Sequence, residues 1–248
     1  YSLIRAGEKI FWLASQGFHG MLPTGLPEAI GKDKFDRFFL DSYDSANLQL
    51  VIGAADPQST RVFWTFRSSA ASANTFDFLI CYDYAVGRAT LIEQSGEYIA
   101  SLAAPGITLE NLDSISASID ALTQSLDDIS TAAVAKLSIV NTSHIVGFFS
   151  GSNIEATLDT SEQAGGRRFR VKGIRPITDA ATCYGSIGAR ETVQSAVAYS
   201  IEQAVNGSGV CPANVSTRMA RGRLRIPSAT TWTFASGVEP TVAQEGQR

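Results

Sequence analysis

Short runs of β-forming residues, separated by turn signals, recur along the first part of the chain. The runs are rich in aromatic and β-branched residues, and Gly, Pro and Asp bound them at a spacing of roughly 8–12 residues. They cover residues 9–14, 49–55, 61–66, 76–82 and 89–93. This pattern predicts an antiparallel all-β region of the sandwich, barrel or propeller type.

Similar runs resume after residue 135, and the polar tail Val238–Arg248 is expected to be an exposed extension or a docking arm. Strands are expected over 136–142, 145–150, 153–158, 168–174, 183–189, 192–203, 221–226 and 230–235. Gly185–Arg190 superficially resembles a phosphate-binding loop but lacks the Gly-Lys-Ser/Thr ending. We therefore interpret its glycines as turn residues between two strands.

One short helix and one repeat interrupt the strands. Asp33–Leu40 is expected to be helical, with Asp33 as N-cap and three phenylalanines on one face. Residues 109–135 place Leu or Ile three and four residues apart, a heptad pattern, but Ser, Thr and Asp fill the other positions and weaken helices. This segment, helical or extended, is interpreted as a connector between regions 1–108 and 136–248.

Length and charge narrow the class of protein. The 248 residues suffice for a sizeable core, and a net charge of −4 excludes a nucleic-acid binder that works through bulk positive charge. No apolar run is long enough for a membrane-spanning helix. The chain lacks an initiator Met and a signal peptide, so we expect a processed product or a part of something longer.

The cysteines and histidines predict no metal centre. Three widely spaced cysteines do not make a disulfide framework, which fits assembly in a reducing cytoplasm, although a Cys183–Cys211 bridge stays open. With two histidines and no Cys-x-x-Cys motif, a structural zinc site is not expected. Asp41–Asn47 has oxygen ligands at partial calcium-loop spacing but no Gly at the sixth position and no distal Glu.

No catalytic constellation is apparent either. Acidic pairs such as Asp41/Asp44 and Asp127/Asp128 are expected by chance among 24 acidic residues, and adjacent acids on a strand point to opposite faces. A serine nucleophile would need a partner base and a Gly-x-Ser-x-Gly elbow, and no such elbow is present. We therefore predict a non-enzymatic protein without catalytic residues, cofactor or metal.

Two strands carry basic residues at alternate positions, so that the side chains of each strand share one face. These residues are Arg168, Arg170 and Lys172 on one strand and Arg221, Arg223 and Arg225 on the other. The faces are either solvated, or contact another subunit, or line a channel that passes double-stranded DNA without reading its sequence.

Many weak motifs follow one another along the chain. They are Phe11-Trp12 with the Gly17-Phe18 turn, the helix that follows Ile30-Gly31, Ala54-Ala-Asp-Pro57 with Val62-Phe-Trp64, Tyr82-Asp-Tyr84 with Gly87-Arg88, the Leu-Asp repeat, Phe149-Ser-Gly-Ser-Asn153, Arg175-Pro176, Gly188-Ala-Arg190 and Gly222-Arg-Leu-Arg225 before Trp232 and Gly237-Val238. The order of these motifs resembles the tail nozzle, or tail hub and stabilisation, protein family of short-tailed bacteriophages.

The resemblance implies an all-β fold of antiparallel propeller-like blades, a second β-rich, sandwich-like half that possibly closes the same propeller, and a few short helices. It further implies a homohexameric ring in the virion, assembled in the host cytoplasm. The ring would lie below the portal and adaptor, extend and close the DNA exit channel, and anchor tailspikes or fibres. Within such a ring the two basic faces would contact a neighbouring subunit or the passing DNA, and subunit contacts are favoured because a lumen that binds DNA tightly would slow its exit.

Two other classes remain open. The first is a carbohydrate-binding receptor-recognition protein that uses Trp12, Trp64 or Trp232, although all three lie in apolar runs typical of a core. The second is a glycan-depolymerising tail enzyme, which would need two carboxylates across a sugar-binding cleft.

Overall fold

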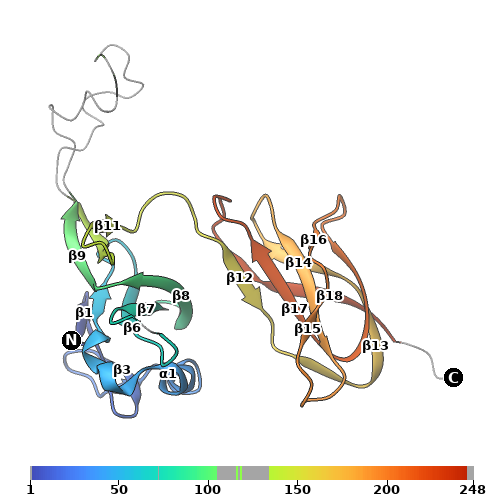
Figure 1. The fold of residues 1–248 in the computed structure, drawn as a ribbon, viewed down its shortest axis with the longest axis horizontal. Helices are drawn as coiled ribbons and strands as arrows, with labels where there is room; N and C mark the ends of the chain where they lie inside the picture. Colours follow the sequence, from blue (N-terminus) through green and yellow to red (C-terminus); the bar gives the residue numbers. More distant parts are fainter. Residues whose placement is uncertain (1, 72, 105–115, 117, 119–133, 245–248) are drawn as a thin grey trace. The chain divides into compact units, whose positions relative to one another are not determined.

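The computed structural model of the protein describes residues 2–71, 73–104, 116, 118 and 134–244 and divides into two compact units (Figure 1). The units are Tyr1–Phe149 and Ser150–Arg248. Both are built mainly from antiparallel β-sheet with little helix, which confirms the predicted all-β class. Most of the repeat predicted over 109–135 lies outside the described residues.

The described residues of the first unit form three antiparallel sheets and two short helices. The sheets have the orders β1-β2-β3-β4, β5-β6-β7-β8 and β11-β10-β9. The strands are β1 (Ile4–Ala6), β2 (Lys9–Ala14), β3 (Gly17–Met21), β4 (Glu28–Ala29), β5 (Gly53–Ala55), β6 (Arg61–Phe66), β7 (Phe76–Asp83), β8 (Arg88–Gly96), β9 (Tyr98–Ala104), β10 (Val134–Val140) and β11 (Val146–Phe148). The helices are α1 (Asp36–Ser42) and the 3₁₀ helix η1 (Ser45–Leu50).

Strand β6 is the centre of this unit because both of its faces are buried. Trp64 and Phe66 join an aromatic cluster with Phe18 of β3 and Phe39 of α1, and the rings of Phe18 and Trp64 lie 4.7 Å apart. Phe63 points the other way and packs in a second cluster with residues of β9 and β10. A continuous apolar run is typical of such a doubly covered strand.

Helix α1 begins later than the sequence predicts. Asp33 lies before the helix with φ of 59°, in the left-handed region, and makes no cap; the N-cap residue is Phe35. Asp36, in the first turn, is buried and accepts a hydrogen bond from the backbone N–H of Phe18 at 3.0 Å. A Cβ at Gly31 would lie within 2 Å of the Asp36 carboxylate, so the glycine leaves room for the acid.

In the first unit, one strand is shorter than predicted and one predicted domain boundary lies elsewhere. The strand expected over 49–55 is reduced to β5, because η1 occupies the chain up to Leu50. Residues 136–142, predicted to start the second region, belong to the first unit: β10 pairs with β9, from Val134 opposite Ala104 to Val140 opposite Tyr98. The repeat therefore connects two neighbouring strands of one sheet.

The second unit is one extensive antiparallel sheet of order β15-β14-β17-β13-β18, with β12 on β17 and β16 on β14. The strands are β12 (Ala156–Asp159), β13 (Gln163–Thr178), β14 (Tyr184–Arg190), β15 (Ala198–Tyr199), β16 (Gln203–Ala204), β17 (Cys211–Ile226) and β18 (Ala235–Gln244). Ile174 of β13, Ile187 of β14 and Cys211 of β17 pack in its core, and Leu224 of β17 lies in an adjoining cluster with Cys183.

Three expectations for this unit were wrong. The tail after residue 237 is not an extension, because β18 pairs with β13 as far as Gln244. The strand expected over 183–189 is present as β14, but its glycines are not turn residues: Gly185 lies inside the strand, against Ile174 and Cys211 of the core. The strand expected over 192–203 is reduced to the two-residue strands β15 and β16.

Candidate functional site

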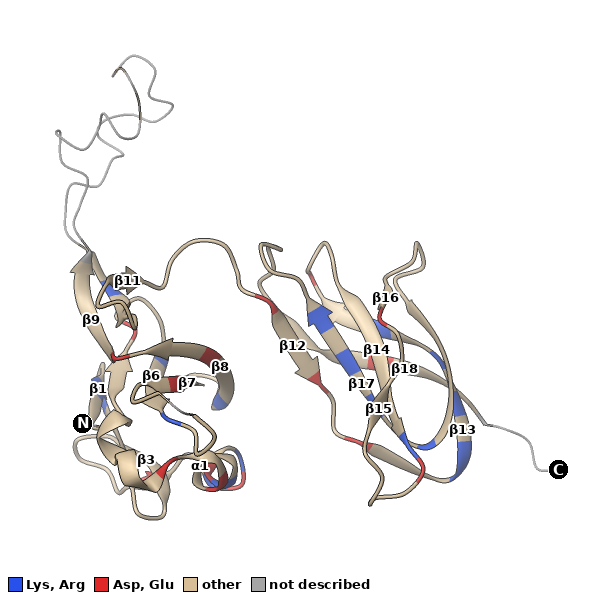
Figure 2. Ribbon diagram, in the orientation of Figure 1, with Lys and Arg blue, Asp and Glu red and all other residues tan. Residues whose placement is uncertain are grey.

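The basic residues of β17 form a row on one face of the second unit, as the alternation predicts. Arg221, Arg223 and Arg225 are half-buried, and the residues between them, Gly222 and Leu224, are buried. Figure 2 shows these basic positions as blue bands along β17. We call Arg221, Arg223 and Arg225 the arginine row.

Each arginine of the row meets acids or aromatic rings from neighbouring strands. Arg223 donates two hydrogen bonds to the Asp159 carboxylate on β12, at 2.6 and 2.8 Å. Its guanidinium carbon lies 3.7 Å from the ring centre of Tyr199, whose hydroxyl also donates to Asp159. The hydrogen bonds from Arg223 lower the pKa of Asp159, and they raise the pKa of the guanidinium.

The two other arginines are held in related ways. Arg225 forms ion pairs with Glu155 at 3.0 Å and with Glu202 at 2.7 Å, and its guanidinium lies 4.8 Å from the ring centre of Tyr184. Arg221 lies 5.2 Å from the Tyr199 ring centre and makes no ion pair with any described residue.

Arg190 of β14 adds a further pair at the same sheet, to Glu162 at 2.7 Å. The side chains of Arg190 and Glu162 are both about four-fifths buried, so this pair is screened less than a surface ion pair. Four arginines thus lie among four carboxylates, and the surface around the arginine row carries little excess charge.

Gly188 of β14 makes the stacking possible. It lies opposite both Arg221 of β17 and Tyr199 of β15. A Cβ at this position would meet Tyr199 at 2.9 Å and the Arg221 side chain at 3.1 Å. The arginines could be found from the sequence but their partners were missed, although Glu155, directly before β12, and Asp159, at its end, lie an even number of positions apart, as side chains on one face of an extended segment do.

The basic face of β13 is less compact. Arg168 donates two hydrogen bonds to Glu191, and Arg170 is likewise engaged in an interaction. Lys172 is exposed and makes no ion pair with a described residue. The predicted basic residues therefore lie on two separate strands of one sheet, and most are paired within the chain.

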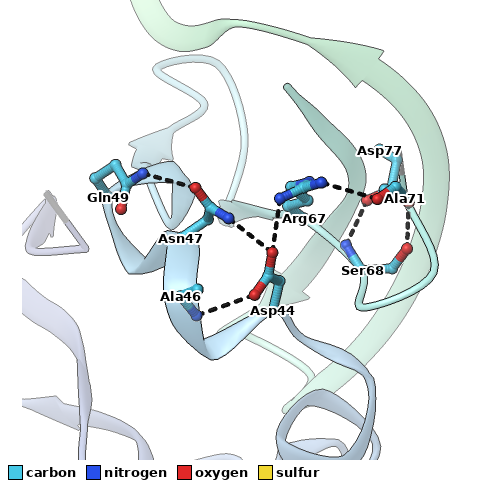
Figure 3. Close-up of polar contacts among 8 residues, drawn as sticks. All are labelled: Asp44, Ala46, Asn47, Gln49, Arg67, Ser68, Ala71 and Asp77. Atoms are coloured by element: carbon cyan, nitrogen blue, oxygen red, sulfur yellow. Dashed lines mark hydrogen bonds and ion pairs between the residues drawn. The ribbon is translucent and has the colours of Figure 1, made fainter. Parts of the chain in front are cut away.

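The acidic residues Asp41 and Asp44 of the first unit make separate local contacts, and those of Asp44 are drawn in Figure 3. Asp44 caps η1 through a hydrogen bond from the Ala46 N–H at 3.0 Å, and forms an ion pair with Arg67 at 2.7 Å. Asp41 is exposed and lies 3.7 Å from Arg37 of the same helix. The two carboxylates do not converge on a common site.

The tryptophans and cysteines contribute mainly to packing. Trp64 is fully buried, Trp232 is half-buried in the core of the second unit, and Trp12 stacks on His19 with ring centres 5.9 Å apart. Cys183 and Cys211 are both buried free thiols, so the structure contains no bridge between them.

Neither a metal site nor a membrane helix emerges from the described residues. No three of their His, Cys, Asp or Glu side chains gather as a metal-binding set. None of the helices among them has the length and apolarity needed to cross a membrane. Comparisons with protein-family models and with curated proteins gave no match for this chain.

Proposed function

We propose that this protein is a structural component of a phage tail. In this proposal, copies of the chain form a homohexameric nozzle or hub ring below the portal and adaptor. The ring extends and closes the DNA exit channel and anchors spikes or fibres. The protein acts by contact with its own copies and with these partners, and it carries out no reaction.

The observation that carries the proposal is the pair of long strands at sheet edges. β8, with nine residues, ends the order β5-β6-β7-β8, and β18, with ten, ends the order of the second unit. Edge strands present a row of N–H and C=O groups that promotes pairing with other chains unless it is covered. A closed ring of copies covers such edges.

The sheet orders of the first unit are also compatible with propeller blades. β1 to β4 and β5 to β8 are two successive four-stranded sheets whose strands follow the chain order. Propeller blades are four-stranded antiparallel sheets of this kind. Together with the order of the sequence motifs, this supports the family on which the proposal rests.

The ion pairs between arginines and carboxylates in the second unit support a role in which DNA passes without being bound. A protein that neutralises several phosphates with unpaired Lys and Arg binds DNA tightly. Asp159, Glu155 and Glu202 already neutralise Arg223 and Arg225. A channel wall with such pairs would let double-stranded DNA move past, with no readout of its sequence.

The native mass of the purified full chain tests the proposal. We expect a ring of six copies at micromolar concentration, visible as such by electron microscopy. A chain that stays monomeric at high concentration would refute the proposal. Glycan binding that is lost in Trp12→Ala without unfolding would instead favour the carbohydrate-binding alternative.

A further inference from the structure

A four-residue bulge interrupts β13 where it runs beside β17. Pairing advances from Ala164 to Phe169 on β13 but by only two residues on β17, so that Gly165–Arg168 stand opposite Arg218 alone. The bulge borders a basin of about 490 Å³, whose lining includes Phe169 and Val242. We call this the bulge basin.

The local sequence explains the shape of the bulge. A Cβ at Gly165 would lie 2.8 Å from the Phe169 ring and 2.8 Å from the carbonyl oxygen of Arg167, so this close approach needs a glycine. Gly166, by contrast, faces open space. The tight turn leaves Arg167 and Arg168 at the rim of the basin.

The basin has an excess of positive charge. Glu191 accepts a hydrogen bond from Arg168 at 2.7 Å, and Arg218 lies 3.9 Å from the same carboxylate. Arg167 is exposed and makes no ion pair within the described part of the chain. Among the described residues, Arg167, Arg168 and Arg218 therefore lie near the single carboxylate of Glu191. Arg168 is also engaged in a further interaction, so Arg167 is the cation of this rim left for a ligand.

The basin also has an apolar wall. Phe169 is half-buried, and Val242 of β18 is about half exposed. A cationic rim beside an apolar wall is complementary to a ligand that carries carboxylates next to aliphatic groups.

We propose that the bulge basin binds residues 109–135 of a second copy of this chain. The inference rests on the proposed function, since it names one contact between copies of the ring. The segment contains five carboxylates and no Lys or Arg. Aspartates follow aliphatic residues directly in Leu112-Asp113, Ile119-Asp120 and Leu126-Asp127. Its charge and its apolar content thus both match the basin.

A polypeptide fits the basin better than nucleic acid does. Glu191 already neutralises part of the positive charge of Arg168 and Arg218, so the basin is too weakly charged to bind by phosphate contacts alone. Phosphate contacts would also leave the apolar wall of Phe169 and Val242 without a partner. Carboxylates spaced by Leu and Ile side chains use both parts of the surface.

Assembly of full-length variants tests this inference. Arg167→Glu replaces an exposed cation by an anion, and we expect the association constant of the copies to fall about tenfold or more, because attraction to the acidic segment becomes repulsion. Lys32→Glu is the matched control: it makes the same charge change at an exposed position of the first unit, outside the basin lining and outside both basic strand faces. We expect this control to assemble like the wild type.

A charge swap between the basin and the acidic segment provides the stronger test. D113K/D120K/D127K should weaken assembly in the wild-type background, and combined with R167E it should regain a large part of the lost affinity. If the wild type assembles and R167E assembles equally well, the inference is overturned while the proposed function stands. A wild type that is monomeric would remove both.

A direct binding measurement separates peptide from nucleic acid. A fluorescent peptide of residues 109–135 is titrated with full-length D113N/D120N/D127N/D128N, whose own repeat no longer competes. We expect binding that weakens with salt, is lost with Asn in place of the peptide's Asp, and falls about tenfold in R167E. Binding of a short DNA duplex, but not of the peptide, with the same dependence on Arg167 would overturn the inference.

Discussion

The contact between Gly222 and Val238 offers a sharp test of how the sheet of the second unit curves. Gly222 lies on β17 and Val238 on β18, and β13 separates the two strands in the sheet order. A Cβ at Gly222 would nevertheless lie 2.4 Å from the Val238 Cγ2. The two strands therefore face each other across the core of a curved sheet.

The expected cost of Gly222→Ala follows from this distance. Carbon atoms in contact lie about 3.5–4.0 Å apart, so the new methyl group forces a displacement of more than about 1 Å. Overpacking of this kind costs about 1–3 kcal/mol. Val238→Ala removes the clashing Cγ2 and costs about 1 kcal/mol by itself, because Val238 is only half-buried.

The double variant distinguishes this contact from a general effect of the substitutions. In G222A/V238A the new methyl group occupies the space that Val238 leaves. The double variant should therefore be less destabilised than the sum of the single variants by about 1–2 kcal/mol. Gly207→Ala is the control, since a Cβ there meets nothing within 4 Å, and its effect should stay within about 0.5 kcal/mol.

The assay must report on the second unit alone, because a chain of two units need not unfold in one step. Trp232 packs in the same core cluster as Val238, so the ¹⁹F signal of 5-fluorotryptophan at this position, followed through urea unfolding, gives the required free energy. Strictly additive costs in the double variant would refute the assigned contact between Gly222 and Val238.

Three further predictions concern single side chains. Trp64→Ala should destabilise the first unit by about 3–5 kcal/mol in urea unfolding, because it empties the fully buried centre of the aromatic cluster; a change below about 1 kcal/mol would contradict this packing. The pKa of Asp159 is lowered in the folded state by the hydrogen bonds from Arg223, so its stabilisation is present above the unfolded value of 3.8 and is lost as the pH falls through the lowered pKa. The stability difference between the wild type and Asp159→Asn should therefore shrink in this acid range, and a difference independent of pH would count against the pairing. Burial raises the pKa of the Cys211 thiol to about 11, and that of Cys183 is raised by the same cause, so native protein should resist alkylation at both sites until it unfolds, as mass spectrometry can check.

Several elements could be predicted from sequence because their signal is local. The apolar run Lys9–Ala14 coincides with β2, and Arg61–Phe66 coincides with β6. In both cases a strand of β-branched and aromatic residues is bounded by polar turns, so propensity and burial agree. The arginines of the row share one face because side chains on a strand alternate between its two faces. This alternation can be read from one strand without knowing which strand pairs with it.

Other features depended on contacts between residues far apart in the chain. Asp33 looked like a helix cap, but the helix begins at Asp36, whose carboxylate accepts a hydrogen bond from the backbone N–H of Phe18, eighteen residues earlier. Gly185 and Gly188 looked like turn residues, yet β14 needs them where Ile174 and Arg221 approach. From the sequence alone, a glycine that allows a turn cannot be told from a glycine that leaves room for a side chain packed against the strand.

The sequence alone determined the β class, the strands with an uninterrupted apolar pattern and the alternation of the basic residues. Tertiary structure decided which carboxylates neutralise those residues, where the first unit ends and that β18 belongs to the sheet. The physical reason is that periodicity is a property of one strand, whereas strand pairing and charge neutralisation depend on register between strands, to which residues far apart in the chain contribute.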